Sequence, residues 1–234
     1  MQIGGLQKTT LIDYPGKIAC TVFLVGCNFR CPFCYSSELV LPEKIQNQPQ
    51  IPEKDFFQFL KEKRGYLDGV VVCGGEPTLH NDLEKFLAKI KKMGFLIKLD
   101  TNGSRPEVLK KLIEKKLVDY VAMDIKAPLK NDLYERATGV KIDLNKIRES
   151  INLLKNSSVD YEFRTTVVPG IHKLEDIVEI AKEIKPAKRY YLQNFRPEKT
   201  LDPTLLAIKP YSKEELEKII AEIKNFFEDC NLRD

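Results

Sequence analysis

The stretch that decides the fold of this 234-residue chain is Gly26-Cys27-Asn28-Phe29-Arg30-Cys31-Pro32-Phe33-Cys34. Its three cysteines follow the spacing C-x3-C-x2-C, with an aromatic residue directly before the last one. Three thiolates from so short a loop can hold three corners of an iron–sulfur cube, whereas a [4Fe–4S] cluster normally takes four cysteines. The spacing therefore predicts that Cys27, Cys31 and Cys34 bind such a cluster and leave one iron open for a ligand that takes part in chemistry.

A structural zinc site or a disulfide is the simpler interpretation of these cysteines. A structural zinc ion takes four nitrogen or sulfur ligands, yet His80 and His172 lie far from the loop in the sequence, and we expect both to be ordinary loop or helix-start residues. The other cysteines, Cys20, Cys73 and Cys230, form no second C-x-x-C pair, and a disulfide would leave one loop cysteine unpaired. A non-catalytic iron–sulfur or zinc-binding module stays open as an alternative.

The composition is that of one cytoplasmic domain spanning residues 1–234. The chain is 43% hydrophobic, which is enough for a proper core. No run approaches the ~20 apolar residues of a membrane span, and Met1–Thr10 lacks the apolar segment of a signal peptide. Cysteines without such a signal point to metal binding in a reducing cytoplasm. A net charge of +4 is mild and does not indicate nucleic acid as a partner.

Apolar, β-branched runs alternate with helical patterns along the chain. The predicted strands are Ile18–Val25, Gly69–Cys73, Phe95–Leu99, Tyr120–Asp124, Tyr161–Val167 and Arg189–Asn194. Strands that alternate with helices favour parallel βα units. Six such units are too few for a closed eight-stranded barrel, so we predict an α/β fold of the open (β/α)6 partial TIM barrel type.

Capping patterns predict where several helices begin. A Ser, Thr, Asp or Asn followed three residues later by Glu is the signature of a capping box. It occurs at Asn81-x-x-Glu84, Ser104-x-x-Glu107 and Ser212-x-x-Glu215. The last of these helices has an apolar face that continues to Phe226 and Phe227.

Unusual motifs stand at the end of each predicted strand. In parallel α/β folds the functional groups gather at the carboxyl ends of the strands. In strand order, the motifs are the cysteine loop, Gly74-Gly75-Glu76-Pro77, Asp100-Thr101-Asn102-Gly103, Asp124-Ile125-Lys126, Arg164, and Gln193-Asn194-Phe195-Arg196. We therefore expect all of them at one rim of the sheet, in a single site.

The cysteine loop followed by Gly74-Gly75-Glu76 resembles the signature of the radical S-adenosylmethionine (SAM) superfamily. On its own, a Gly-Gly pair before a helix is usually a turn. The resemblance implies that SAM chelates the open iron, that the two glycines let the backbone approach it closely, and that Glu76 helps to hold the ammonium group of SAM. It also implies that Phe33 packs near the adenine.

The later motifs resemble the glycyl-radical-enzyme activases of that superfamily. The resemblance implies a monovalent cation, Na⁺ or K⁺, held by Asp100, Thr101 and Asp124 beside the SAM carboxylate. Lys126 would lie near the substrate or that carboxylate, and Arg164 would contact SAM. The simpler interpretation of these residues is Asx turns, a surface ion pair and a solvent-facing arginine.

Two more positions belong to this predicted SAM site. Asn102 lies within the Asp-Thr-Asn-Gly segment. At the end of the sixth strand, where activases often carry a histidine, the chain has Gln193 and Arg196 as the candidate replacements.

Nearly the whole chain resembles anaerobic ribonucleoside-triphosphate reductase activating proteins, including the opening Gly4-Gly5-Leu6-Gln7-Lys8 and Tyr14-Pro15-Gly16-Lys17. Tyr35, where such activases often have histidine, is a departure. The resemblance implies reductive cleavage of SAM to a 5′-deoxyadenosyl radical, with a ferredoxin or flavodoxin as electron donor. The radical would generate a glycyl radical on an anaerobic ribonucleotide reductase.

A second enzyme class stays open. A radical SAM enzyme that acts on a small molecule or a modified nucleoside, similar to 7-carboxy-7-deazaguanine synthase, would have the same motifs. An activase needs an open face that admits a glycine loop, whereas a small-molecule enzyme closes its pocket with C-terminal elements. Residues Arg196–Pro210 are compatible with either arrangement.

Overall fold

The computed structural model describes residues 1–233, which fold around one sheet of eight strands in chain order. The strands are β1 (Ile3–Thr10), β2 (Ala19–Leu24), β3 (Gly69–Gly74), β4 (Leu96–Thr101), β5 (Tyr120–Asp124), β6 (Asp160–Val167), β7 (Ala187–Asn194) and β8 (Phe227–Arg233). β1 is antiparallel to β2, and every later neighbour pair is parallel. The carboxyl ends of β2–β8 therefore share one edge of the sheet.

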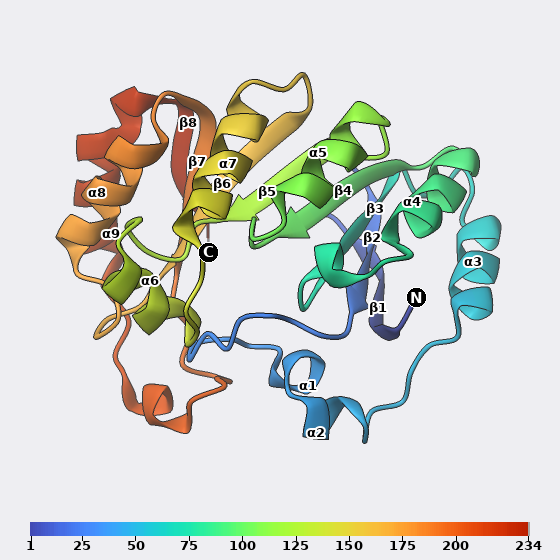
Figure 1. Ribbon diagram of the computed structural model, residues 1–234, viewed down its shortest axis with the longest axis horizontal. Coiled ribbons are helices and arrows are strands. Elements are labelled where there is room, and N and C mark those ends of the chain that lie inside the picture. Colours follow the sequence, from blue (N-terminus) through green and yellow to red (C-terminus); the bar gives the residue numbers. More distant parts are fainter. Residues whose placement is uncertain (234) are drawn as a thin grey trace.

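Helices lie around the outside of the curved sheet (Figure 1). They are α1 (Ser37–Val40), α2 (Pro42–Ile45), α3 (Glu53–Glu62), α4 (Leu83–Lys92), α5 (Pro106–Glu114), α6 (Asn131–Thr138), α7 (Leu144–Lys155), α8 (Leu174–Ile184) and α9 (Lys213–Ile223). Three short 3-10 turns, η1 (Pro77–Leu79), η2 (Pro203–Ala207) and η3 (Lys224–Phe226), complete the elements. No helix among residues 1–233 combines the length and the apolar character that a membrane crossing requires.

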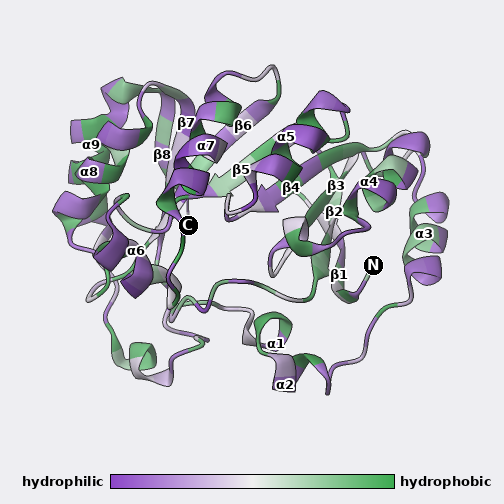
Figure 2. Cartoon of the chain, in the orientation of Figure 1, coloured by the Kyte–Doolittle hydropathy of each residue, from purple (hydrophilic) through white to green (hydrophobic). Residues whose placement is uncertain are grey.

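Apolar spacing explains why the helices pack on the sheet. In α4, the buried residues Leu83, Phe86, Leu87 and Ile90 recur every three or four positions, so they form one face. Figure 2 shows hydrophobic and hydrophilic residues along the same helical ribbons. β5, covered on both faces, is instead buried from Tyr120 to Met123, as expected for a parallel strand.

The six predicted strands are confirmed as β2–β7, and the open partial-barrel fold is confirmed with them. Two strands were missed. β1 contains Gly4 and Gly5 and exposes much of its polar second half, so it lacks an apolar run. β8 begins at Phe227, where an apolar helix face was predicted, because the α9 helix ends at Ile223 and η3 redirects the chain into the sheet.

Only one of the three predicted capping boxes is correct. The Ser212 hydroxyl accepts from the backbone N–H of Glu215, and the Glu215 carboxylate accepts from the Ser212 N–H at 2.8 Å. The Asn81 box is wrong because α4 begins at Leu83, with Asp82 at the N-cap position, and Glu84 instead pairs with Lys111 of α5 and Lys115 directly after it. The Ser104 box is wrong because α5 begins at Pro106, whose fixed φ suits a first helical position.

Candidate active site

A cavity of about 730 Å³ opens at the carboxyl ends of the parallel strands. Pockets that hold small molecules measure roughly 300–1,000 Å³. Every predicted site residue except Glu76 lines this cavity: Cys27, Cys31, Phe33, Cys34, Gly74, Gly75, Asp100, Thr101, Asn102, Asp124, Lys126, Arg164 and Gln193. Arg196 also lines it. The topology thus brings together residues that lie up to 169 positions apart, from Cys27 to Arg196.

The cysteine loop is fixed by backbone contacts with a helix turn far away in the sequence. The N–H of Arg30 donates to the carbonyl of Thr138 at 2.7 Å, directly before Gly139. Gly139 has φ +68°, and a Cβ there would lie 2.5 Å from the Arg30 carbonyl oxygen. Only glycine therefore fits this turn without displacing the loop.

Two of the loop thiols have shifted acidities. Burial raises the pKa of Cys27 to about 12 and that of Cys31 to about 11, while the nearby Lys126 ammonium acts in the opposite direction on both. A cation beside thiol groups favours the thiolate, which is the form that binds metal. Within residues 1–233, no three His, Cys, Asp or Glu side chains gather closely enough for a single metal ion. An iron–sulfur cluster does not need such close side chains, because each thiolate binds a different iron.

Glu76 lies behind the cavity wall. Its side chain is fully buried, and its carboxylate accepts from Thr78 Oγ1 at 2.5 Å, from Thr101 Oγ1 at 2.8 Å and from the N–H of Asn102 at 2.7 Å. Burial raises the pKa of Glu76, and these donors oppose that shift. The carboxylate joins the loops after β3 and β4, and its predicted contact with the SAM ammonium stays a prediction.

An amide network extends this connection to the cysteine loop. Asn102 Nδ2 donates to Asn28 Oδ1 at 2.9 Å, and Asn28 Nδ2 donates to Ser104 Oγ at 2.9 Å. The N–H of Ser104 in turn donates to Asn102 Oδ1 at 3.0 Å. Asn28 and Ser104 were missed as site residues. Their only sequence signal is their position inside the two loops.

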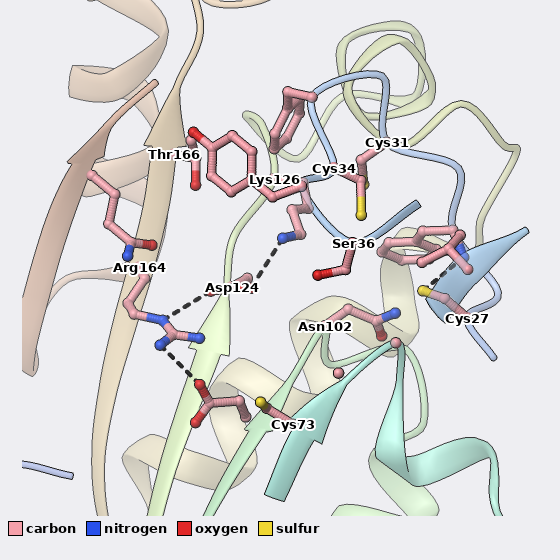
Figure 3. Close-up of a pocket in the computed structure, with 18 of the residues that line it drawn as sticks. Cys27, Cys31, Cys34, Ser36, Cys73, Asn102, Asp124, Lys126, Arg164 and Thr166 are labelled. Atoms are coloured by element: carbon pink, nitrogen blue, oxygen red, sulfur yellow. Dashed lines mark hydrogen bonds and ion pairs between the residues drawn. The ribbon is translucent and has the colours of Figure 1, made fainter. Parts of the chain in front are cut away.

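A row of alternating charges crosses the ends of β4, β5 and β6, and Figure 3 shows its central part. We call it the ionic ladder: Lys98, Asp100, Arg164, Asp124 and Lys126. Lys98 Nζ lies 2.5 Å from Asp100 Oδ1, and Arg164 Nη1 lies 3.0 Å from Asp100 Oδ2. Arg164 Nε lies 2.9 Å from Asp124 Oδ1, and Lys126 Nζ lies 3.0 Å from Asp124 Oδ2. All four carboxylate oxygens are therefore paired with cations of the chain.

The cations of the ladder hold the Asp124 carboxylate ionised. Burial alone would raise the pKa of Asp124, but the Arg164 and Lys126 cations outweigh it and lower that pKa to about 2. Burial correspondingly lowers the pKa of Lys126, and the Asp124 carboxylate more than compensates, so the pKa rises. The Arg164 side chain is 13% exposed and pairs with Asp100 inside the barrel. The alternative of a solvent-facing arginine is therefore wrong.

His172 is not an ordinary loop residue. Its Nδ1 accepts from the N–H of Val168 at 3.0 Å, so the ring proton lies on Nε2, which donates to the carbonyl of Lys126 at 2.7 Å. Burial lowers the pKa of His172, which favours this neutral form. The ring also meets Phe33 edge-on, with centroids 6.2 Å apart. His172 thus positions the backbone of Lys126 and one wall of the cavity.

Two more residues line the cavity: Asn194, which belongs to the last strand-end motif but had no predicted role, and Arg233, which the sequence did not reveal. Asn194 Nδ2 donates to the carbonyl of Tyr211 at 2.7 Å, whereas the buried Oδ1 has no partner within residues 1–233. Arg233, from β8, pairs with the fully buried Glu162 at 2.6 and 2.8 Å and lies 3.6 Å from the Tyr191 ring centroid. Arg233 therefore adds a cation to the lining of the cavity.

Residues 21–184 match the radical SAM superfamily. The chain belongs to this superfamily. It is therefore a radical SAM enzyme, and enzymes of this family work with a [4Fe–4S] cluster and SAM. The residues that line the cavity fit both groups: the three loop thiols suit the cluster, and the Arg164 and Lys126 cations suit the SAM carboxylate.

Three known proteins are similar to this chain in sequence or in fold. A candidate glycyl-radical enzyme activating enzyme of Methanocaldococcus jannaschii is 36% identical over 99% of this chain and 95% of its own length. The pyruvate formate-lyase-activating enzyme of Listeria monocytogenes is 32% identical over 53% of each chain. The crystal structure of QueE from Escherichia coli has the same fold, with a TM-score of 0.55 and 15% identity over 99% of this chain and 93% of that one.

Proposed function

We propose that this radical SAM enzyme generates a glycyl radical on a partner enzyme. The observation that carries the proposal is the 36% identity, over almost the full length of both chains, to a candidate activating enzyme. The ionic ladder beside the cysteine loop is consistent with it, since the motifs that build the ladder are those that resemble activases. When bound, the reduced cluster supplies the electron that cleaves SAM into methionine and a 5′-deoxyadenosyl radical, which takes a hydrogen atom from the substrate.

The residues of the chain bind and orient the reactants. Gly74 and Gly75 let the end of β3 pack closely on β2 and the cysteine loop, because a Cβ on Gly75 would collide with the Gly26 carbonyl. The cations Arg164 and Lys126 attract the SAM carboxylate from the side of the ladder. Phe33 lines the cavity with its ring centroid 5.9 Å from Lys126 Nζ, and in this proposal it packs near the adenine.

The partner that we propose is an anaerobic ribonucleoside-triphosphate reductase. The support is the resemblance of the opening segment, the cysteine loop and the strand-end motifs to activating proteins of that class. A ferredoxin or flavodoxin would deliver the electron, in the cytoplasm. The cluster would be held by Cys27, Cys31 and Cys34 alone, which leaves one iron for SAM.

The decisive experiment is anaerobic. The protein is reconstituted with iron and sulfide, reduced, and mixed with SAM and a candidate anaerobic ribonucleotide reductase. We expect a glycyl EPR doublet on the reductase and an equal amount of 5′-deoxyadenosine. Cys27→Ala should abolish both, whereas Cys20→Ala, a buried cysteine outside the loop, should retain them. Absence of SAM cleavage in the intact protein would instead support a non-catalytic metal-binding module.

One observation favours a second candidate, a radical SAM enzyme for a small molecule or modified nucleoside. The segment after β7 lies against the cysteine loop and α1 and forms a strap, residues 195–208. The N–H of Asp202 donates to the Pro32 carbonyl at 2.9 Å, and Lys199 pairs with Glu38 at 2.5 Å. A covered cavity suits a small substrate. Formation of 5′-deoxyadenosine without any radical on the partner, but increased by a nucleoside, would favour this candidate.

A further inference from the structure

The two carboxylates expected to share a monovalent cation already carry cations of the chain. Arg164 bridges them, with Nη1 3.0 Å from Asp100 Oδ2 and Nε 2.9 Å from Asp124 Oδ1. Lys98 and Lys126 pair with the two remaining oxygens. The site does not fit an added Na⁺ or K⁺ ion, because such an ion would need oxygens that are in use. We propose that the Lys98 ammonium, together with Arg164, replaces the monovalent cation, so that this enzyme binds SAM without one.

The pairing of Lys98 with Asp100 is fixed by the strand that carries both residues. The Lys98 side chain is 1% exposed, and its ammonium points at Asp100 from two positions earlier on β4. Residues i and i+2 of a strand lie on the same face, so the strand itself sets the pair. Lys126, two positions after Asp124, mirrors it at the end of β5. Each carboxylate therefore keeps one ammonium even if Arg164 turns toward a bound carboxylate.

The charges support the same conclusion. The ladder has three cations and two anions, which leaves a net charge of +1. One ligand carboxylate brings that sum to zero. An additional alkali ion would leave an uncompensated positive charge in a largely buried site, which is unfavourable where the effective dielectric constant is low. An ammonium group is itself a compact cation of unit charge, and so serves as the internal equivalent.

The inference rests on the proposed binding of SAM in this cavity, and it is tested by binding rather than by turnover. The reconstituted protein is titrated with SAM by calorimetry in KCl, in NaCl and in choline chloride at equal ionic strength. We expect the wild-type dissociation constant to agree within about twofold in all three salts. A rise of about tenfold in choline would overturn the proposal.

Lys98→Met removes the ammonium and keeps the length of the side chain. We expect this variant to bind SAM about tenfold more weakly in choline than in KCl, because K⁺ then enters the vacated position. Lys110→Met, at an exposed position of α5, is the matched control and should behave as wild type. If Lys98→Met binds SAM equally in KCl and choline, the proposal is wrong.

Melting temperatures of the protein without cluster or SAM separate this inference from the proposed function. We expect KCl to raise the melting temperature of Lys98→Met above its value in choline, and to leave wild type unchanged. If wild type binds no SAM in any salt, the proposed function fails. The melting temperatures in KCl and choline then still show whether the Lys98 ammonium takes the place of a monovalent cation in the ladder. A K⁺-dependent rise in wild type, or none in Lys98→Met, contradicts the inference.

Discussion

The buried carboxylate of Glu76 connects two loops on which the site depends. It accepts from Thr78, Thr101 and the backbone of Asn102, and unlike Thr101 and Asn102 it does not itself line the cavity. Sequence patterns place a glutamate after two glycines but do not reveal which way its side chain turns. Packing decides this, because every donor around Glu76 comes from the protein itself.

Glu76→Gln should destabilise the protein. The amide keeps the size of the side chain but turns one acceptor into a donor that faces other donors, at a cost of about 1–3 kcal/mol. Urea unfolding of the apoprotein measures this change. Glu222→Gln, at an exposed position of α9, is the control and should shift the free energy of unfolding by less than about 0.5 kcal/mol. An unchanged midpoint for Glu76→Gln would show that the loops hold together without the carboxylate.

The ion pairs of Asp124 make the free energy of unfolding depend on pH in the acidic range. The pKa of Asp124 is lowered from the usual 3.8 to about 2, so its ion pairs stabilise the fold fully above about pH 4 and are lost as the pH falls through 2. The loss should reach about 2 kcal/mol. Urea unfolding at a series of pH values tests this, with Asp124→Asn expected to be less stable at pH 7 and to lose less on acidification. Asp132→Asn, which is exposed, should follow wild type.

The turn between α6 and α7 acts on the cysteine loop through Gly139. Its positive φ and the nearby Arg30 carbonyl both exclude a side chain. This contact links elements about a hundred residues apart, so only the tertiary structure shows that α6 supports the cluster loop. The glycine itself is a typical helix C-cap and would have been interpreted as that alone.

Comparing Gly139→Ala with Gly94→Ala separates the strain of a positive φ from the collision with the Arg30 carbonyl. Both glycines have positive φ, which costs alanine about 1–2 kcal/mol, but a Cβ at Gly94 meets nothing within 4 Å. We expect Gly139→Ala to lose more stability than Gly94→Ala and also to bind less iron after reconstitution. Iron and sulfide analysis measures the second effect. Equal iron content in the two variants would contradict a role of this turn in holding the loop.

The strap over the cavity bears on how a macromolecular substrate enters. It runs from the end of β7 to the cysteine loop, where the N–H of Asp202 donates to the carbonyl of Pro32, and the two segments are neighbours in Figure 1. Tyr35 contributes twice: its hydroxyl accepts from the N–H of Arg196 at 2.8 Å, and its ring stacks on Phe195. A protein loop that enters between the strap and the cysteine loop must first loosen these contacts.

Lys199→Glu should loosen the strap, because it replaces the ion pair with Glu38 by two carboxylates that repel each other. An exposed ion pair contributes no more than about 1 kcal/mol, so the KM for the proposed partner reductase should fall by up to about fivefold. The affinity for SAM should not change. The charge reversal Glu38→Lys with Lys199→Glu restores the pair and is the control. A raised KM in the single variant would favour the small-molecule enzyme, whose cavity must stay closed.

The sequence by itself determined the cysteine loop, the six inner strands β2–β7 and the clustering of the strand-end motifs. These follow from local spacing together with the shared carboxyl edge of parallel strands. Only the tertiary structure decided the roles of Lys98, Asn28, His172 and Arg233. Lys98 lies within an apolar strand pattern, and Arg233 belongs to a strand that resembled the end of a helix. Their partners come from other strands and loops, and such pairings depend on register and burial, which no local pattern specifies.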